Sequence, residues 1–357
     1  MRWSWGGSLA RRTARVVGAV GAVVLAAGLV VIGDGAASAR TDEPVRPKVL
    51  VLGDSLSQGF GGDSTWRYWF WRETNRQGVP VDFVGPDAGF IAGYGTRYER
   101  PNLAFDRHHA ARGGSTVNDH LAKVDALMTT YQPDVVVVEL GVNDALRGDS
   151  GATIAAELEE LMGHVWQQAP AAQVLLAEVP SHQARPEADA AGSEANALLA
   201  ARFADDGRVF VAHNRTDAQR PWAPSVHTFD GLHPNAAGQT LLAQHLVDAY
   251  HRAGRLPQAP QVYQQRTWSP NVLPRLILSG RTLTVDWSRG MTEIKMSQVR
   301  IRIRKRTATT HRDTPWYPTG TRRITRTLTR GTYDVQLIPR RWSMIGAPGQ
   351  RVTVQVR

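Results

Sequence analysis

The 357-residue sequence predicts an α/β domain built on a parallel sheet, followed by an all-β sandwich. Over residues 48–251, short apolar segments alternate with helical patterns, as in parallel sheets covered by helices on both faces. Residues 262–357 instead hold short β-prone segments between glycine-containing turns, which favours a two-sheet sandwich. The sequence has no cysteine, which excludes disulfides, thiolate metal sites and a cysteine nucleophile, so each domain must be stable through its own apolar core.

Residues 1–39 predict a secretory signal peptide. Several arginines precede the uncharged apolar stretch 16–33, and Ala37-Ser38-Ala39 supplies the small residues of a cleavage site. We therefore expect cleavage after Ala39 and a secreted protein. Because 18 apolar residues can just span a bilayer, an uncleaved membrane anchor is the less favoured alternative.

The α/β domain is expected over residues 46–253. Its strands are expected at residues 48–52, 81–84, 135–138, 174–177 and 208–211. Its helices are expected at residues 65–77, 117–131, 153–168, 193–203 and 235–251, where apolar residues recur at helical spacing. The four valines at 135–138 show no polar alternation, which indicates a strand covered on both faces. Ligands of such folds bind beyond the carboxyl ends of the strands, so residues that follow the strands are the candidates for a site.

A linker is expected at residues 254–261, where a glycine and two prolines follow the last helix. The strands expected beyond it are 276–278, 282–287, 299–304, 332–338 and 352–356. In Val299–Arg304, valine and isoleucine alternate with arginine, so the apolar side chains should face the core and the arginines the outside.

Charge separates the two domains. Residues 40–257 carry 19 Lys and Arg against 27 Asp and Glu, a net of −8, whereas residues 258–357 carry 19 against 4, a net of +15. The basic domain predicts attachment to an anionic polysaccharide or another anionic cell-surface polymer. A spacer whose arginines are merely solvated is the alternative. No recognised nucleic-acid-binding motif is visible, so we expect no specific nucleic acid partner.

Four polar residues form a constellation that could hydrolyse an ester. Ser55 follows the first strand, and a serine hydroxyl becomes a nucleophile when a neighbouring base takes its proton. His233 can be that base, and Asp230 can fix its tautomer. The backbone N–H of Ser55, a glycine amide at 113–114 and the side-chain amide of Asn143 can stabilise the oxyanion.

At these positions the sequence resembles the SGNH/GDSL hydrolase family of esterases and lipases. The matching blocks, in the family's order, are Gly53-Asp54-Ser55-Leu56, Gly114-Ser115-Thr116, Gly141-Val142-Asn143-Asp144 and Asp230-Gly231-Leu232-His233. The resemblance covers about residues 48–250 and implies the flavodoxin-like three-layer α/β/α fold of that family. The segment Gly61–Tyr68 also looks like secreted actinobacterial members.

The resemblance implies roles for single residues. Ser55 is the nucleophile, His233 the base and Asp230 its orienting group, with Ser55, Gly114 and Asn143 in the oxyanion hole. Gly114 is preferred to the adjacent glycine, Gly113, because the family pattern has a glycine two residues before a Thr or Ser.

These residues predict a serine esterase that forms an acyl-enzyme and needs neither a metal nor an organic cofactor. Its expected substrates are short acyl esters, such as acetyl groups on polysaccharide, with lipid esters as the runner-up. A non-catalytic surface-binding protein with a degenerate hydrolase scaffold is the rival from another class. We expect a monomer.

Other conspicuous residues receive simpler interpretations. Trp287 and the segment Gly331–Val335 resemble a fibronectin type III domain, although an immunoglobulin-like domain would look similar. The pair His108-His109 is expected at the surface of a loop. The three tryptophans of the first helix, Trp66, Trp69 and Trp71, are expected to pack in the core, with a sugar-binding platform as the alternative.

Overall fold

Five parallel strands form the sheet of the first domain, in the order β2-β1-β3-β4-β5. The strands are β1 (Lys48–Gly53), β2 (Asp82–Val84), β3 (Val135–Glu139), β4 (Gln173–Ala177) and β5 (Val209–Ala212). The order is that of flavodoxin-type doubly wound sheets, in which the switch of direction lies between β1 and β3. The predicted parallel α/β fold is therefore confirmed.

The computed structural model describes residues 46–91, 104–263, 267–270, 272–288 and 294–357. The signal peptide predicted at residues 1–39 lies outside these described residues. Within the described ranges, no helix is long and apolar enough to cross a bilayer.

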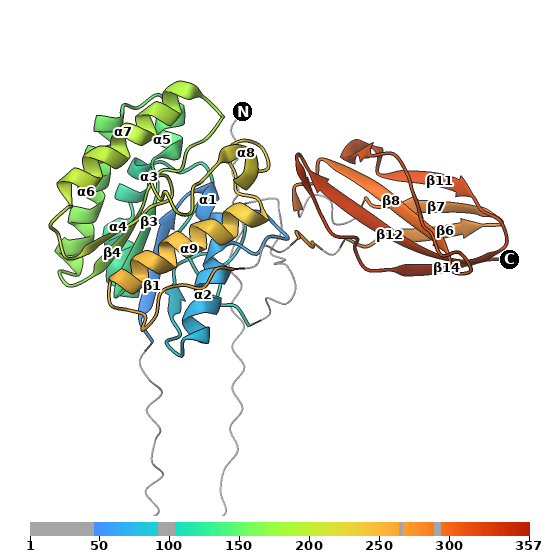
Figure 1. The fold of residues 1–357 in the computed structure, drawn as a ribbon, viewed down its shortest axis with the longest axis horizontal. Helices are drawn as coiled ribbons and strands as arrows, with labels where there is room; N and C mark the ends of the chain where they lie inside the picture. The colour runs from blue at the N-terminus through green and yellow to red at the C-terminus, as the bar shows by residue number, and fades with distance from the viewer. Residues whose placement is uncertain (1–45, 92–103, 264–266, 271, 289–293) are drawn as a thin grey trace, which may run out of the picture. The chain divides into compact units, whose positions relative to one another are not determined.

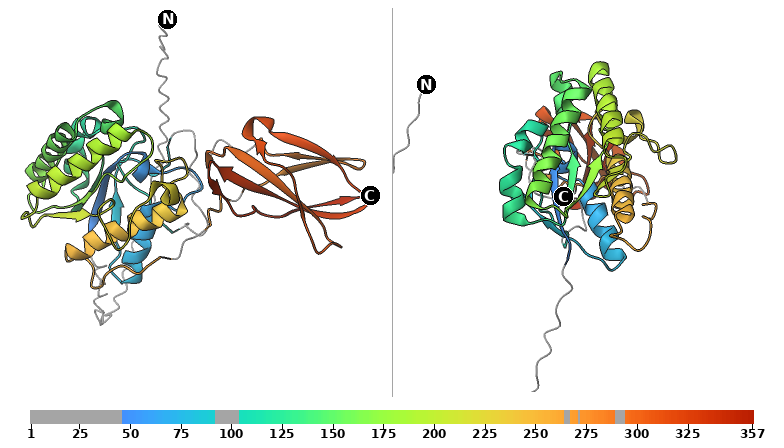
Figure 2. Two further views of the ribbon diagram at one scale, coloured as in Figure 1. Left: turned by 45° about the horizontal axis from the view of Figure 1, so that its top comes forward. Right: turned by 90° about the vertical axis from the view of Figure 1, so that its left-hand side faces the viewer.

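Helices cover both faces of the sheet (Figures 1 and 2). One face is covered by α2 (Trp66–Arg76) and α9 (Ala236–Arg252). The other face is covered by α3 (Val117–Leu121), α4 (Val124–Tyr131), α5 (Val142–Arg147), α6 (Gly151–Gln168) and α7 (Pro186–Arg202). Two single-turn helices, α1 (Ser55–Gln58) and α8 (Pro224–His227), belong to the connections.

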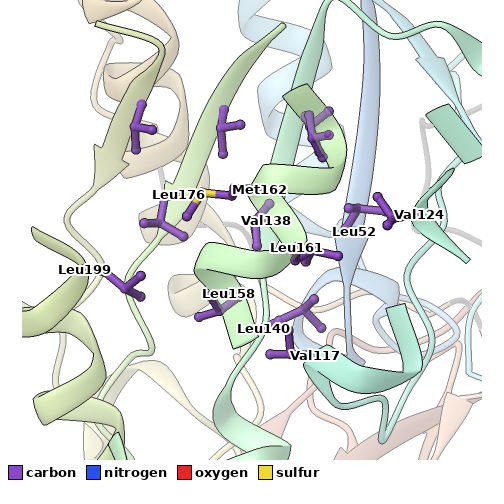
Figure 3. Close-up of a cluster of buried hydrophobic side chains, with 14 of the residues drawn as sticks. Leu52, Val117, Val124, Val138, Leu140, Leu158, Leu161, Met162, Leu176 and Leu199 are labelled. Carbon is purple, nitrogen blue, oxygen red and sulfur yellow. The ribbon is translucent and has the colours of Figure 1, made fainter. Parts of the chain in front are cut away.

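The core on the α6 side shows why the valine-rich strands need cover on both faces. Leu158, Leu161 and Met162 of α6 pack over Val138 of β3, in the cluster drawn in Figure 3. Each of these four side chains is at most 1% exposed. Burying a side chain of this size contributes about 1.5–3 kcal/mol, so this interface holds the sheet and its helices together.

Two helices differ from the sequence prediction. The helix expected at 117–131 is interrupted between Leu121 and Val124, giving α3 and α4. Helix α7 begins at Pro186, seven residues earlier than expected, because proline is well suited to the first turn. Gly192 looks like a helix breaker in the sequence, yet it lies inside α7, where a Cβ would come within 2.8 Å of the Val179 side chain.

The C-terminal region consists of antiparallel sheets, as predicted. A three-stranded sheet contains β6 (Arg275–Ser279), β7 (Thr282–Asp286) and β11 (Arg323–Thr327). The second sheet contains β8 (Gln298–Lys305), β9 (Arg312–Asp313), β10 (Tyr317–Pro318), β12 (Gly331–Arg341), β13 (Met344–Ile345) and β14 (Val352–Val356). A 3₁₀ turn at Thr319–Thr321 precedes β11.

One core lies between these two sheets. Leu283 and Val285 of β7 belong to the same buried cluster as Val299 and Ile301 of β8. The arginines that alternate with the apolar residues of β8 are partly exposed, as the period-two pattern predicts. The described residues from 46 onward belong to one compact unit, which contains both the α/β domain and the β region.

Candidate active site

Ser55 stands at the point where β1 turns into α1. The Asp54 carboxylate caps the helix by accepting the Leu56 N–H at 2.8 Å. The turn is tight enough that a Cβ on Gly53 would meet the Ser57 Oγ at 2.5 Å, so this position requires glycine. The result is a serine fixed by local backbone geometry at the carboxyl edge of the sheet, with 7% of its surface exposed.

His233 and Asp230 meet Ser55 from a loop 178 positions further along the chain. His233 Nε2 lies 3.1 Å from Ser55 Oγ, and His233 Nδ1 lies 2.8 Å from Asp230 Oδ2. Asp230 Oδ1 also accepts the backbone N–H of His233 at 2.8 Å, so one carboxylate holds both the ring and the chain that carries it. The two side chains are less than a fifth exposed, at 17% and 19%.

The charge of Asp230 suits this arrangement. Burial favours a raised pKa, but the hydrogen bonds and the charge of His233 outweigh it, and the pKa of Asp230 lies below its ordinary value. The carboxylate is therefore ionised at neutral pH. An ionised acid behind an imidazole stabilises the cation formed when that imidazole takes a proton from a serine.

Two backbone N–H groups are available as oxyanion donors. Neither the Ser55 N–H nor the Gly114 N–H has an acceptor among the described residues. The neighbouring Gly113 N–H, by contrast, donates to Gln58 Oε1 at 2.7 Å. Gly114 has a φ of +81°, a conformation that glycine adopts without strain. Of the two glycines weighed in the sequence, only Gly114 thus has a free amide.

Asn143 lies at the start of α5 beside the same group of residues. Its Nδ2 donates to Asp54 Oδ2 and to the Ser115 carbonyl, each at 3.0 Å. Both amide hydrogens therefore point to protein acceptors, and donation to an oxyanion requires that one of them be shared or redirected. The hydrogen bond between Asn143 and Asp54 was not foreseen from the sequence.

Three buried carboxyl groups lie under the nucleophile. Burial raises the pKa of Glu139 to about 7 and that of Asp144 to about 6. Burial, with repulsion from these two acids, raises the pKa of Asp54 as well. Glu139 accepts hydrogen bonds from Ser57 Oγ and, at 2.8 Å, from Trp66 Nε1. Sequence reasoning missed Glu139, although an acid that directly follows four valines was a usable signal.

One sequence interpretation needs revision, and another is confirmed for Trp66 and Trp69. His109 is not at the surface: it is fully buried, with its ring nitrogens bonded to the Gly89 carbonyl and the Ala111 N–H. Trp66 and Trp69 are 0% and 3% exposed, so they pack in the core as expected and cannot form a sugar platform. Within the described part of the chain, no group of three or more His, Asp or Glu side chains could hold a metal ion.

Comparison with known proteins agrees with this chemistry. Residues 51–241, more than half of the chain, match the model of the GDSL-like Lipase/Acylhydrolase family. The chain is similar to an arylesterase of Vibrio mimicus, with 24% identity over 201 residues that cover 55% of this chain and 84% of the relative.

Among solved structures, the chain is similar to a carbohydrate esterase family 3 protein from Talaromyces cellulolyticus. The identity is 20%, the match covers 56% of this chain and 94% of that one, and the TM-score is 0.48. It is also similar to the Clostridium thermocellum family 3 carbohydrate esterase, at 21% identity, with 56% and 93% of the two chains covered and a TM-score of 0.46.

Proposed function

Because the chain belongs to the GDSL-like lipase/acylhydrolase family and is an ester-hydrolysing enzyme, we propose that it is a serine esterase whose catalytic residues are Ser55, His233 and Asp230. The observation that carries this proposal is the continuous hydrogen-bonded chain from Ser55 Oγ through the His233 ring to the Asp230 carboxylate, with distances of 3.1 and 2.8 Å. These lengths are within hydrogen-bond reach for proton transfer.

In the proposed reaction, Ser55 Oγ attacks the ester carbonyl while His233 Nε2 takes its proton. The Ser55 and Gly114 N–H groups donate to the oxyanion, and the side-chain amide of Asn143 joins them. Collapse of the tetrahedral intermediate expels the alcohol, which receives the proton from His233. A water molecule activated by His233 then attacks the acyl-enzyme, and the acid leaves as Ser55 is regenerated.

We propose short acyl esters as substrates, including acetyl groups on polysaccharide. The sequence contains no long apolar insertion of the kind that covers a lipid-binding site, which favours short acyl chains. Hydrolysis of lipid esters is the alternative.

A series of p-nitrophenyl esters from acetate to palmitate tests the proposal. We expect the highest kcat/KM for the shortest acyl chains and a loss of at least about 10³-fold in kcat for Ser55→Ala and His233→Ala. Ser225→Ala, an exposed serine in α8, is the matched control and should keep full activity. Equal turnover by the wild type and a folded Ser55→Ala variant would refute the mechanism and favour the non-catalytic alternative.

We also propose that the protein is secreted and that its basic C-terminal domain, which resembles a fibronectin type III domain, attaches it to an anionic surface polymer. The net charge of +15 over residues 258–357 supports attachment, because a surface of one sign attracts polyanions over several ångströms. Such attachment should be reversed by salt, since the Debye length falls to about 3 Å at 1 M. Detection of the chain in culture medium, without residues 1–39, would test secretion.

A further inference from the structure

Arg341, the last residue of β12, is inserted into the α/β domain. Its side chain is fully buried, and its Nη1 donates to both carboxylate oxygens of Asp63 at 2.7 and 2.9 Å. Its Nη2 donates to the Gly61 carbonyl at 2.9 Å and to the Ile294 carbonyl at 2.6 Å. A guanidinium with this many partners fixes the position of the segment that follows α1.

Arg341 also lies beside two aromatic rings that pack against His233, the proposed base. Phe60 meets the His233 ring edge-on with centroids 5.0 Å apart, and Phe229 stacks on the same ring with centroids 5.8 Å apart. The Arg341 guanidinium lies 5.4 Å from the Phe60 centroid and 5.2 Å from that of Phe229. Lys295 Nζ lies 4.0 and 5.8 Å from the same two centroids. Cations held at these distances attract ring faces.

Further contacts tie the β region to the histidine loop. Trp342 stacks on Phe229 at 5.8 Å, and Ser343 donates from its N–H and its hydroxyl to the Phe229 carbonyl. Lys295 and Trp342 both have positive φ, +47° and +45°, which is costly for side chains of this size. Such backbone conformations persist only where surrounding contacts impose them, and the Trp342 backbone is held by hydrogen bonds with Ser297 Oγ and Arg340 Nε.

We propose that Arg341 and Lys295, from the C-terminal β domain, are positioning residues of the hydrolytic site, which hold Phe60 and Phe229 against the His233 imidazole. This inference rests on the proposed function, since it assumes that His233 is the base. The β domain is then part of the catalytic apparatus in addition to any role in attachment.

Charged groups of both signs surround these rings. Asp230 and Asp63 bring negative charge near the His233 imidazole, while Lys295 and Arg341 bring positive charge close to the same aromatic rings. Residues that only hold the imidazole in place act on the reaction step and not on substrate binding, so their removal should lower kcat and leave KM nearly unchanged.

The experiment uses the full chain, p-nitrophenyl acetate and five variants, with folding followed by circular dichroism. Lys295→Met keeps the aliphatic stem and should lower kcat about tenfold while leaving KM within about twofold. Lys295→Arg keeps the charge beside the rings and should restore most of kcat. Arg341→Lys keeps the charge but loses the planar fork, so kcat should also fall about tenfold.

Lys305→Met is the matched control, because Lys305 belongs to the same β region and its Nζ contacts the Thr329 hydroxyl instead of Phe60 and Phe229. Its kcat and KM should equal those of the wild type. If Arg341→Lys fails to fold, the variants of the partly exposed Lys295 decide the test. A folded Lys295→Met variant with wild-type kcat would overturn the inference, while an inactive Ser55→Ala variant left the proposed function standing. An active Ser55→Ala would refute the proposed function itself.

Discussion

The two glycines that could complete the oxyanion hole differ in the hydrogen bonding of their backbone N–H groups. The Gly113 N–H donates to Gln58 Oε1, whereas the Gly114 N–H has no acceptor within the described residues. The Gly114 carbonyl accepts from Arg147 Nη2 at 2.9 Å, which fixes the peptide that follows it. Because an oxyanion donor must be aimed before the reaction begins, this fixed, free amide makes Gly114 the better candidate.

Gly114→Ala tests that assignment. A Cβ at this position meets nothing within 4 Å, so the cost in stability comes only from the positive φ, about 1–2 kcal/mol. The N–H remains, but a left-handed alanine relaxes toward negative φ and turns the amide away. We expect kcat for p-nitrophenyl acetate to fall about 10–100-fold, with KM little changed.

Gly254→Ala provides the control, because Gly254 also has a positive φ, +72°, and open space around its Cβ position, and lies just after α9. It should lose similar stability and no activity. Equal kcat in Gly114→Ala and Gly254→Ala would remove Gly114 from the oxyanion hole.

At this scale, the sequence indicates which side chains come together where short local motifs shape the backbone. Ser55, His233 and Asp230 occupy short motifs whose backbone turns are encoded by adjacent glycines, and the structure brings the three side chains together. The direction of the Asn143 amide and the burial of Glu139 depend on packing from several elements. No local pattern encodes such packing, so the sequence did not reveal these features.

The loops after β4 and β5 are joined by one carboxylate. Glu178, directly after β4, accepts the backbone N–H groups of Arg215 and Thr216 and the Thr216 hydroxyl. Burial favours a raised pKa, but hydrogen bonds from His213, Arg215 and Thr216 outweigh it, and the pKa of Glu178 lies below its ordinary value. The ionised group thus stabilises this edge of the sheet.

Glu178→Gln should show that effect as a pH-dependent loss of stability. A lowered folded-state pKa gives a contribution that is present above the unfolded pKa, near 4.5, and is lost as the pH falls through the folded value. We expect the free energy of unfolding to drop by about 1–3 kcal/mol at pH 7 and the difference from wild type to shrink below about pH 4. Urea unfolding at both pH values measures this.

The exposed Glu187 on α7 offers a comparison, since Glu187→Gln should change stability little at either pH. A Glu178→Gln deficit that is the same at pH 7 and pH 4 would mean that packing, and not the ionised carboxylate, is responsible.

Elements were predictable where their apolar pattern is strong. The five parallel strands and the helices α2, α6 and α9 appear close to the expected places, because strong apolar patterns leave few alternatives. Strand β11 was missed because Ile324 is its one strongly apolar residue, and it forms by pairing with β7. Pairing partners that lie far apart in the sequence are not encoded in a local pattern.

Across the whole chain, the positive charge of the β region is not evenly available to a partner. Asp334 forms ion pairs with Arg304, Arg306 and Arg351, and Arg302 pairs with Asp313. On β11, by contrast, Arg323 and Arg326 are exposed and form no ion pair with any described residue, although Arg323 lies opposite Asp286 of β7 and interacts with its charge at longer range. We therefore expect a polyanion to be attracted most strongly to β11. The positive electrostatic potential of the paired arginines is partly cancelled by the nearby carboxylates.

Two double variants with the same change in net charge distinguish a local site from a general effect. Arg323→Gln with Arg326→Gln should elute from an immobilised sulfated polysaccharide at clearly lower salt than the wild type. Arg302→Gln with Arg304→Gln, which removes two paired arginines, should elute nearer the wild-type position, while both keep full esterase activity. If the two variants shift equally, net charge alone governs retention, and if neither shifts, the basic domain is a spacer whose arginines are merely solvated.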